Sequence, residues 1–184
     1  NLYPVYELSR LGHTSWTLTE LETEPAQAAP TALSLSVGSA GSTTFKYKVT
    51  ANNATTSEES LTGLNNSTLT ITGITQASPA VVTVTAHGLD TGDEIFVTGV
   101  VGMTEVNDRR FIVDNIGANT FSLRDEDSTG HTAYGSSGTA RRTFVVTAAS
   151  SATPNNTISW TAAAGASKYG VYKQSNGLYG LIGE

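Results

Sequence analysis

Apolar residues in this chain recur at every second position over short runs, separated by Gly, Asn or Ser about every ten residues. In one run Phe45, Tyr47 and Val49 share one side of an extended chain. Lys46 and Lys48 lie on the other side, which is the pattern of a half-buried antiparallel strand with one core face. The same alternation occurs at 69–72, 82–85, 111–113, 121–123, 158–160 and 169–172. This spacing predicts an all-β fold built from sandwiches or small barrels.

The clearest turn signal is Asn176-Gly177, which lies between two of these runs. Both residues accept the positive φ angles of a tight hairpin turn, so we expect a β-hairpin here. Helix signals are scarce. Thr56–Glu59 has the spacing of a capping box, but Thr62-Gly63 follows too soon for a stable helix. We expect at most a single helical turn in this region.

The charge content excludes several classes of partner. Only 14% of the 184 residues are charged and the formal net charge is −6, so a nucleic-acid duplex or an anionic membrane would feel net repulsion. Cys is absent, which excludes disulfides, thiolate metal sites and a Cys nucleophile. No stretch approaches the roughly 18 consecutive apolar residues of a membrane span. The chain starts without Met and stops inside an apolar run, so we expect it to be a piece of a longer protein.

Composition also divides the chain into parts. Residues 1–28 carry aromatic residues, an acidic cluster and an Ala/Pro linker, and we expect an extended segment that packs on something else. Residues 73–141 hold half of the charged residues, whereas 29–72 and 142–184 carry few charges and are rich in Thr, Ser and Ala. This contrast predicts a small β-barrel inserted into a split sandwich.

The two flanks resemble parts of a fibronectin type III domain. Ile158–Thr161 and Gly165–Tyr172 are similar to its second and third strands, where a Trp and a later Tyr meet in the core. Phe45–Asn52 resembles the Tyr-x-Tyr-x-Val strand that comes late in that fold, although here it comes early. The resemblance implies an immunoglobulin-like or fibronectin-like sandwich whose strand order is permuted or split.

The middle of the chain resembles a different family. The segments that carry this resemblance are His87–Leu89, Gly92–Ile95, Gly99–Met103, Glu105–Asn107, Thr120–Leu123, Asp127-Ser128 and Tyr134. In order and spacing they are similar to the first catalytic cysteine half-domain of ubiquitin-activating enzymes, whose small β-barrel matches about residues 71–142. The resemblance implies a fold and no chemistry, because the catalytic Cys belongs to another part of those enzymes. This chain has no Cys and no adenylate-binding region.

A third resemblance concerns the whole arrangement. With Glu7–Trp16 ahead of the barrel and the Tyr-Gly-Val-Tyr-Lys hairpin behind it, the chain resembles the mid-section of the tail nozzle, or tail tubular protein, of short-tailed phages. In that family the nozzle is a ring-forming structural subunit. The resemblance implies a virion protein assembled in the bacterial host cytoplasm. Its partners would be other copies in the ring and neighbouring tail proteins, with no nucleic acid and no membrane insertion, and the isolated fragment can be monomeric.

Histidines offer little basis for catalysis. His13, His87 and His131 are scattered, and no nucleophile-elbow motif accompanies them. We expect His87 to have a turn role beside Gly88, and His13 and His131 to be solvated. The sequence therefore predicts no catalytic residue and no enzyme activity.

Two groups of carboxylates are close in sequence. Asp90, Asp93 and Glu94 form one group and Asp125–Asp127 forms the other, and neither has the alternating spacing and distal Glu of a calcium loop. We expect Asp93 to end a turn, and the second group to be a solvated loop balanced by Arg124. No metal and no cofactor are predicted.

Aromatic residues fall into two groups. Those at alternating strand positions are expected to fill the core: Phe45, Tyr47, Phe111, Phe121, Trp160 and either Tyr169 or Tyr172. Tyr3, Tyr6 and Trp16 lie outside the alternation and are candidate interface residues. Arg109-Arg110 and Arg141-Arg142 are candidates for an inter-subunit charge patch.

Two functions from different classes stay open. The first is a non-enzymatic structural module of a phage tail, whose rigid β domains act through subunit interfaces around a symmetric ring. The alternative is a ligand- or glycan-binding accessory module that contacts the host cell surface. An exposed row of Tyr or Trp on one sheet would favour the alternative, and full burial of Trp160 and the tyrosines would disfavour it.

Overall fold

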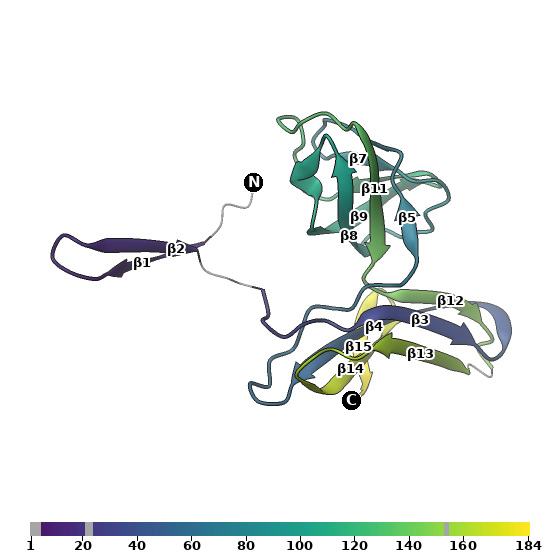
Figure 1. Cartoon of the computed structure of the whole chain (residues 1–184). Coiled ribbons are helices and arrows are strands. Elements are labelled where there is room, and N and C mark those ends of the chain that lie inside the picture. Colours follow the sequence, from purple (N-terminus) through teal and green to yellow (C-terminus); the bar gives the residue numbers. More distant parts are fainter. Residues whose placement is uncertain (1–4, 21–23, 153–154) are drawn as a thin grey trace.

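The computed structural model describes residues 5–20, 24–152 and 155–184, and this part of the chain is almost entirely β-structure. It contains a projecting hairpin, a curled sheet and a two-layer sandwich (Figure 1). In the described ranges the only helical element is a 3-10 turn, η1, at Thr104–Val106. The all-β prediction is confirmed, and no helix forms at Thr56–Glu59.

The N-terminal hairpin pairs β1 (Tyr6–Arg10) with β2 (Trp16–Glu20). Its turn is tightened by hydrogen bonds from the backbone N–H groups of Leu11 and Gly12 to the carbonyl of Ser15. In Figure 1 it projects away from the rest of the molecule.

The sandwich packs a four-stranded antiparallel sheet against a two-stranded sheet. The larger sheet has the order β12-β4-β14-β15, with bounds Val145–Ala149, Ala40–Asn53, Ala166–Ser175 and Leu178–Gly183. The smaller sheet pairs β3 (Thr31–Val37) with β13 (Asn156–Thr161). Buried between them are Leu33, Phe45, Tyr47, Val49, Val145 and Ala149. The sandwich is split along the chain, because β3 and β4 precede the other unit and β12 to β15 follow it.

The unit between β4 and β12 is a seven-stranded sheet curled around its own core. Its order is β5-β11-β8-β9-β10-β7-β6, with bounds Thr68–Thr70, Ser136–Arg142, Glu94–Val101, Arg109–Gly117, Thr120–Leu123, Val81–Thr83 and Gly73–Ile74. The edge strands β5 and β6 are separated only by Ile71-Thr72, so one chain segment pairs with β11 and then with β7. The sequence predicts a small β-barrel here, whereas the observed sheet curls without closing, because β5 and β6 are not paired with each other.

The chain passes between the two units twice. It leaves the sandwich through the loop after β4, and it returns through Thr143 and Phe144. Phe144 packs in the core of the curled sheet, whereas the next residue, Val145, packs in the sandwich. The division into 29–72 plus 142–184 and an inserted 73–141 stays a prediction about folding units.

The predicted hairpin near the C-terminal end is confirmed. β14 and β15 are joined by Asn176 and Gly177, whose φ angles of 50° and 82° lie in the left-handed region. Asn and Gly occupy this region at low cost, which explains why the turn forms at this dipeptide.

The aromatic core prediction is confirmed for the four residues Phe45, Tyr47, Phe111 and Phe121, which are all buried. Trp160 and Tyr169 are only half-buried, with ring centroids 5.3 Å apart at one side of the sandwich. Phe144 is fully buried and was not predicted, because it stands alone in a short connection without alternating neighbours.

The half-buried pattern assigned to β4 is wrong, because both faces of this strand are covered. Lys46 is only 5% exposed, although it lies opposite the sandwich core. The inserted unit lies against this face of β4. A pattern read from one strand indicates which face is apolar, but it does not show what covers the other face.

Candidate functional site

The main polar cluster lies where the inserted unit meets β4. Lys46 Nζ lies 2.7 and 2.8 Å from the two carboxylate oxygens of Asp93 and 2.8 Å from Oδ2 of Asp90. Gly92, with a φ of +93°, turns the chain between the two acids, and the backbone N–H of Asp90 donates to Asp93 Oδ2 at 2.9 Å. The expectation that Asp93 ends a turn is confirmed, and its carboxylate also serves as the counter-ion of Lys46.

Burial makes this ion pair a strong structural constraint. The side chains of Lys46 and Asp93 are 5% and 3% exposed, and the ammonium lies 4.9 Å from the centre of the Phe144 ring. Each charge would cost several kcal/mol at this position without its partner. The pair therefore ties a strand of the sandwich to a loop of the inserted unit.

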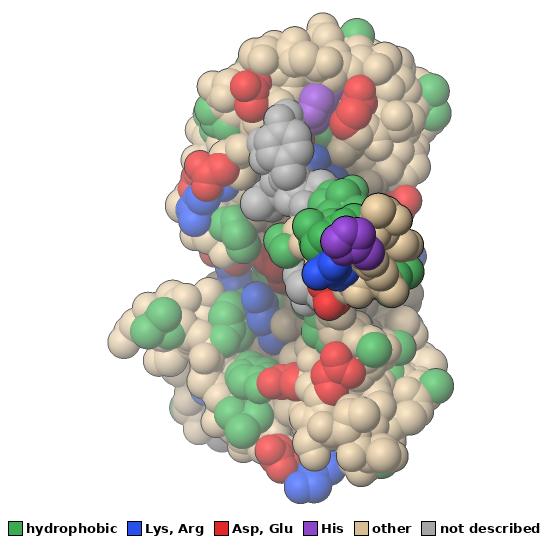
Figure 2. All heavy atoms as spheres, turned by 90° about the vertical axis from the view of Figure 1, so that its left-hand side faces the viewer, with side chains coloured by type: hydrophobic (Ala, Val, Ile, Leu, Met, Phe, Trp, Pro, Cys, Tyr) green, Lys and Arg blue, Asp and Glu red, His purple; other side chains and the backbone are tan. Residues whose placement is uncertain are grey.

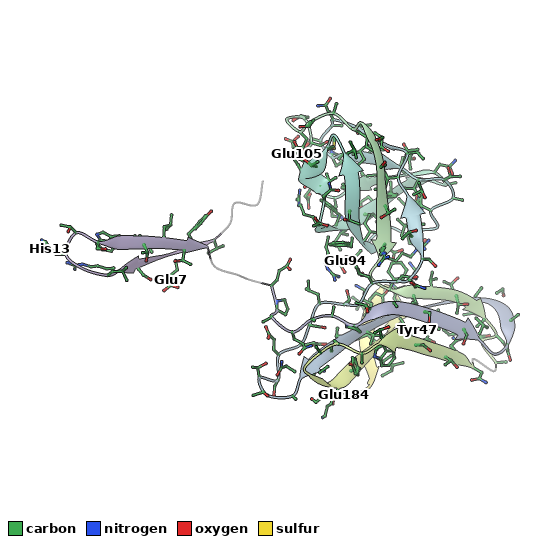
Figure 3. The ribbon with its side chains drawn as sticks, in the orientation of Figure 1. Glu7, His13, Tyr47, Glu94, Glu105 and Glu184 are labelled. Carbon is green, nitrogen blue, oxygen red and sulfur yellow. The ribbon has the colours of Figure 1, made fainter. Side chains whose placement is uncertain are left out.

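A second polar cluster lies beside the first. Arg110 donates from Nη2 to the carbonyl of Thr62 at 2.8 Å and from Nη1 to its hydroxyl at 3.0 Å. Glu94 Oε2 lies 3.5 Å from Arg110 Nη1 and 3.8 Å from Lys48 Nζ. Figure 3 shows Glu94 at the end of the inserted unit that faces the sandwich. Burial lowers the pKa of Lys48, with Glu94 opposing this shift and Arg110 adding to it.

A pocket of about 440 Å³ opens next to this cluster, between the two units. On the sandwich side, the Tyr172 hydroxyl donates to Glu59 Oε1 at 2.5 Å, and the Thr50 hydroxyl donates to the same oxygen at 2.6 Å. The bond to Glu59 raises the pKa of Tyr172. One rim of the pocket is therefore a fixed carboxylate with a tyrosine hydroxyl.

Tyr179 lines the same pocket from β15. Its hydroxyl is buried and has no hydrogen-bond partner among the described residues, and Lys48 Nζ lies 4.7 Å from the centre of its ring. Burial and the negative charges of Asp93 and Glu94 raise the pKa of Tyr179. A neutral phenol whose hydroxyl has no described partner is thus buried in the wall of the pocket.

His87 has the structural role that the sequence predicts. It is 1% exposed, and the backbone N–H of Leu89 donates to Nδ1 at 3.0 Å. Nδ1 is therefore the unprotonated nitrogen, and Nε2–H donates to the carbonyl of Gly117 at 2.7 Å. The ring packs edge-on against Phe121, and Arg142 donates to the carbonyl of His87. Both ring nitrogens are occupied in holding the turn.

The prediction of a solvated acidic loop is wrong at Glu126, and the solvation predicted for His131 is wrong as well. Glu126 is 9% exposed and accepts two hydrogen bonds from Arg109, at 2.8 and 2.7 Å. The His131 side chain is 14% exposed, with Nε2 3.6 Å from Glu126 Oε1. Arg124 pairs with Asp114 instead of with the acidic run. The partner, Arg109, comes from a neighbouring strand, so sequence proximity could not identify it. His13, by contrast, is exposed in the hairpin turn as expected.

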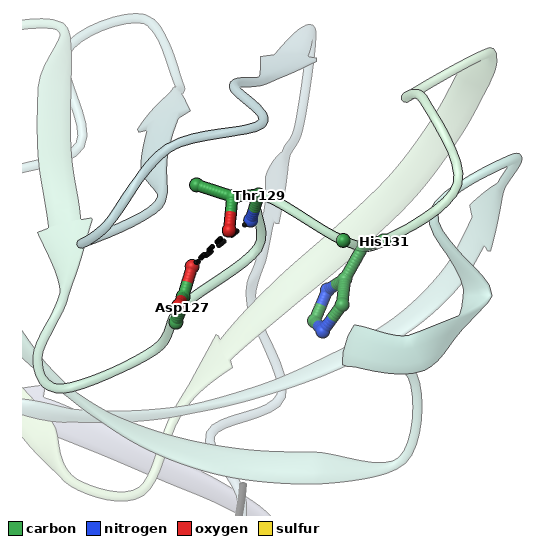
Figure 4. A pocket seen from close by; sticks show the side chains of 4 residues that line it. Asp127, Thr129 and His131 are labelled. Atoms are coloured by element: carbon green, nitrogen blue, oxygen red, sulfur yellow. Dashed lines mark hydrogen bonds between the residues drawn. The ribbon is translucent and has the colours of Figure 1, made fainter.

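A hollow of about 330 Å³ lies in this loop, and Figure 4 shows its polar lining. Asp127 Oδ1 accepts hydrogen bonds from the hydroxyl and the backbone N–H of Thr129, at 2.7 and 3.1 Å, and these bonds lower the pKa of Asp127. This is the geometry of a local turn. Across the described residues, no three His, Cys, Asp or Glu side chains gather in a way that could hold a metal ion.

The predicted interface residues differ in how exposed they are and in whether they already have partners within the chain. Tyr3 lies outside the described residues. Tyr6 and Trp16 are 49% and 54% exposed on the hairpin, where hydrophobic side chains gather (Figure 2). Arg109 and Arg110 make the intrachain bonds given above, and the side chain of Arg109 is 40% exposed. A role at a subunit interface stays a prediction for all of them.

Three residues of the junction were missed by sequence reasoning: Lys46, Thr62 and Tyr179. Lys46 carried a weak signal, since it is a charge inside a strand that is otherwise rich in large apolar side chains. Thr62 lies in an irregular loop and carried none. Tyr179 follows the predicted turn in an alternating run, but its neighbour Lys48 comes from a strand more than a hundred residues earlier.

Comparison with known proteins adds one finding. Residues 77–143 match the family model of the ubiquitin-activating enzyme E1 FCCH domain. The match confirms the resemblance expected for about residues 71–142, and it covers less than half of the chain. No curated protein matches the chain. No helix in the described part is long and apolar enough to cross a membrane. The inserted unit is thus similar to a domain of an enzyme family.

Proposed function

We propose that this chain is a non-enzymatic structural module that acts through subunit interfaces, as part of a phage tail nozzle or tail tube subunit. The observation that carries the proposal is the buried pair of Lys46 and Asp93 at the junction. A module that presents surfaces in fixed register needs its parts held at one angle. A buried, fully paired charge permits few alternative arrangements.

The second polar cluster supports the same conclusion. Arg110 binds both the hydroxyl and the carbonyl of Thr62, and therefore holds the loop after β4 to the inserted unit. Two separate attachments, one to β4 and one to the loop after it, resist rotation better than a single one. The exposed aromatic residues of the hairpin supply a surface that can contact another protein.

The proposal includes a location and partners. The module would be part of the virion, assembled in the bacterial host cytoplasm, and it would contact other copies in a ring and neighbouring tail proteins. It uses no cofactor, and with a net charge of −6 it makes no contact with nucleic acid.

Electron cryo-microscopy of the particle that carries the full-length protein tests this function. The expected result is ordered density for both units, repeated around a symmetry axis at a fixed mutual angle. Density for only one of the two units, or absence of the protein from the particle, would contradict the proposal.

A second function is favoured by the pocket at the junction. Lys48, Arg110, Glu59 and Glu94 line it with two positive and two negative charges, so it suits a neutral ligand better than an ion. The hydroxyls of a saccharide can donate to the carboxylates and accept from the Lys48 ammonium. The module would then be a glycan-binding accessory that contacts the host surface. The half-burial of Trp160 does not decide between the two functions.

An NMR titration with neutral disaccharides tests the second function. Amide shifts centred on Lys48, Glu59 and Tyr179 are expected, together with weaker binding by Lys48→Met, which removes the ammonium donor. Binding that Lys48→Met leaves unchanged, or no shifts at millimolar saccharide, would rule out this pocket.

A further inference from the structure

The two layers of the sandwich differ in width. One layer has the four strands β12-β4-β14-β15 and the other has only β3 and β13. β3 packs over β12, so the uncovered part of the large sheet lies at β14 and β15. A hollow of about 470 Å³ is found there, and its apolar lining comes from Trp160, Tyr169, Val171 and Gly183.

β13 is the edge of the small sheet beside this hollow. Its hydrogen-bonded neighbour among the described residues is β3, so its second edge presents unpaired N–H and C=O groups. The inward residues Ile158 and Trp160 pack on the core but stay half-buried. An open strand edge next to an uncovered apolar surface is an arrangement to which a further strand can add.

The N-terminal hairpin has the complementary features. Its register places Leu8 opposite Leu18 and Arg10 opposite Trp16, so these four side chains share one face. Leu8, Trp16 and Leu18 are 63%, 54% and 64% exposed. The other face is polar and carries Glu7, Ser9, Thr17 and Thr19. This hairpin is thus a two-stranded sheet whose apolar face is left exposed by residues 5–20, 24–152 and 155–184.

We propose that β2 of a second copy adds to the free edge of β13, so that its Trp16 and Leu18 cover the hollow. The two strands of the hairpin together with β3 and β13 then form four strands, which matches the four strands of the opposite sheet. The proposal rests on the proposed function, since it names the partner of the subunit interface. It also gives a role to the exposed aromatic residues of the hairpin.

Charge complementarity favours a second copy as the occupant. Arg10 lies over the Trp16 ring, with its guanidinium carbon 5.5 Å from the ring centre. Glu184 lies on the rim of the hollow, where its side chain is 50% exposed and its partner Lys168 is itself 65% exposed. A Trp16 side chain over the hollow brings the positive charge of Arg10 towards this carboxylate.

The contact would be heterologous, between the hairpin of one copy and the sandwich of the next. After one contact the first copy keeps a free hollow and the second keeps a free hairpin, so the contact can repeat around a ring or along a chain. The hairpin projects away from its own sandwich, which leaves its apolar face available to a neighbour (Figure 1).

Sedimentation velocity of the full chain, at concentrations up to about 1 mM, tests the proposal. The expected result is a sedimentation coefficient that rises with concentration. The double variant Trp16→Glu/Leu18→Glu should weaken association at least about tenfold. Both residues are exposed, so folding should be unaffected. The matched control, Thr17→Glu/Thr19→Glu, adds the same charge to the polar face of the same strand and should leave association within about twofold of the wild type.

A charge exchange tests the orientation of the contact. Arg10→Glu should weaken association, and adding Glu184→Arg to the same chain should restore it. A wild-type chain that stays monomeric throughout overturns the proposal, as does association that survives Trp16→Glu/Leu18→Glu. If the chain stays monomeric and a saccharide shifts the NMR signals of Trp160, the hollow binds a saccharide instead of a second copy, and the proposal is overturned. The rigid-module proposal would survive these failures, because the angle between the two units is measured separately.

The absence of Cys permits a direct test of strand addition. Chains carrying Thr19→Cys are mixed with chains carrying Ser159→Cys, both on the outer, exposed face of their strands. Mild oxidation should link the two kinds of chain by a disulfide. Ser36→Cys, on the outer face of β3, is the matched control and should link much less. Equal linkage of the two pairs would contradict addition at β13.

Discussion

The inserted unit and the sandwich are both all-β, yet they bury their cores in different ways. The inserted unit holds 17 buried hydrophobic residues in its cluster, and the sandwich holds 6, with four half-buried side chains packed against them. The inserted sheet curls, so that a single segment supplies both of its edges and its inward side chains all meet. The sandwich has four strands against two and leaves one end open. Curling lets a small sheet complete its own core, whereas an unequal sandwich depends on neighbours for cover.

The largest expected effect is at the centre of the inserted core. Phe121 is fully buried, so Phe121→Ala should lower the free energy of unfolding by about 4–5 kcal/mol. Urea denaturation followed by NMR signals of the inserted unit measures this. A loss under about 2 kcal/mol would contradict the tight packing described for this unit.

The next largest effect is expected at the junction. Asp93→Ala leaves the Lys46 ammonium buried and without its main partner, and should cost about 3 kcal/mol. The control is the double variant Lys46→Met/Asp93→Leu, which replaces the pair by apolar side chains and should recover most of the loss in the same melts. If Asp93→Ala has no effect, the pair does not hold the two units together.

A smaller effect is expected at the open end of the sandwich. Trp160 is half-buried, so Trp160→Ala should cost about 1–2 kcal/mol, less than the same kind of truncation in the inserted core. Urea melts monitored on sandwich signals give the value. A cost equal to that of Phe121→Ala would mean that this end of the sandwich is closed.

The hairpin of β14 and β15 contains two glycines that can be compared, Gly177 in the turn and Gly180 in β15. A Cβ at Gly177 or at Gly180 meets nothing within 4 Å, but only Gly177 has a positive φ, of +82°. Gly177→Ala should therefore cost about 1 kcal/mol through backbone strain alone. Gly180→Ala should be close to neutral. Equal effects in thermal melts would mean that the turn conformation does not matter.

The smallest effect is a difference in acid sensitivity. Three carboxyl groups of the inserted unit have pKa values lowered below their ordinary range: Asp114 by the hydrogen bond from Arg124, Glu105 by the backbone N–H of Thr132, and Asp127 by Thr129. A carboxyl with a lowered folded-state pKa stabilises the fold above its unfolded pKa and loses this contribution as the pH falls through the folded value. The inserted unit should therefore lose stability below about pH 4.

Chemical denaturation at pH 7 and pH 3, followed separately on signals of each unit, measures the difference. Asp114→Asn removes one of the three groups and should reduce the pH dependence of the inserted unit. A pH dependence confined to the sandwich would contradict this assignment.

Local sequence signals predicted the parts of the fold that depend on local chemistry. Asn176-Gly177 specifies its turn because the two residues tolerate positive φ, whatever lies around them. The alternation in 45–49 identified the apolar face of β4, because successive side chains of a strand point to opposite faces. Both the turn and the apolar face are determined by residues that are close together in the sequence.

The parts that could not be predicted depend on contacts between distant segments. Lys46 reads as a surface residue until Asp93, 47 positions later, is placed beside it. Glu126 reads as part of a solvated loop until Arg109 reaches it from the neighbouring strand. Alternation also places Trp160 in a core, but the number of strands in the facing sheet decides how far it is covered.

We expect the buried junction to hold the inserted unit and the sandwich as one rigid body. Backbone residual dipolar couplings of the chain in a weakly aligning medium test it, with an alignment tensor fitted separately to each unit. A rigid junction predicts two tensors that agree in orientation and magnitude in the wild type and that diverge in Asp93→Ala. Tensors of different magnitude in the wild-type chain would show that the two units move independently, and would contradict it.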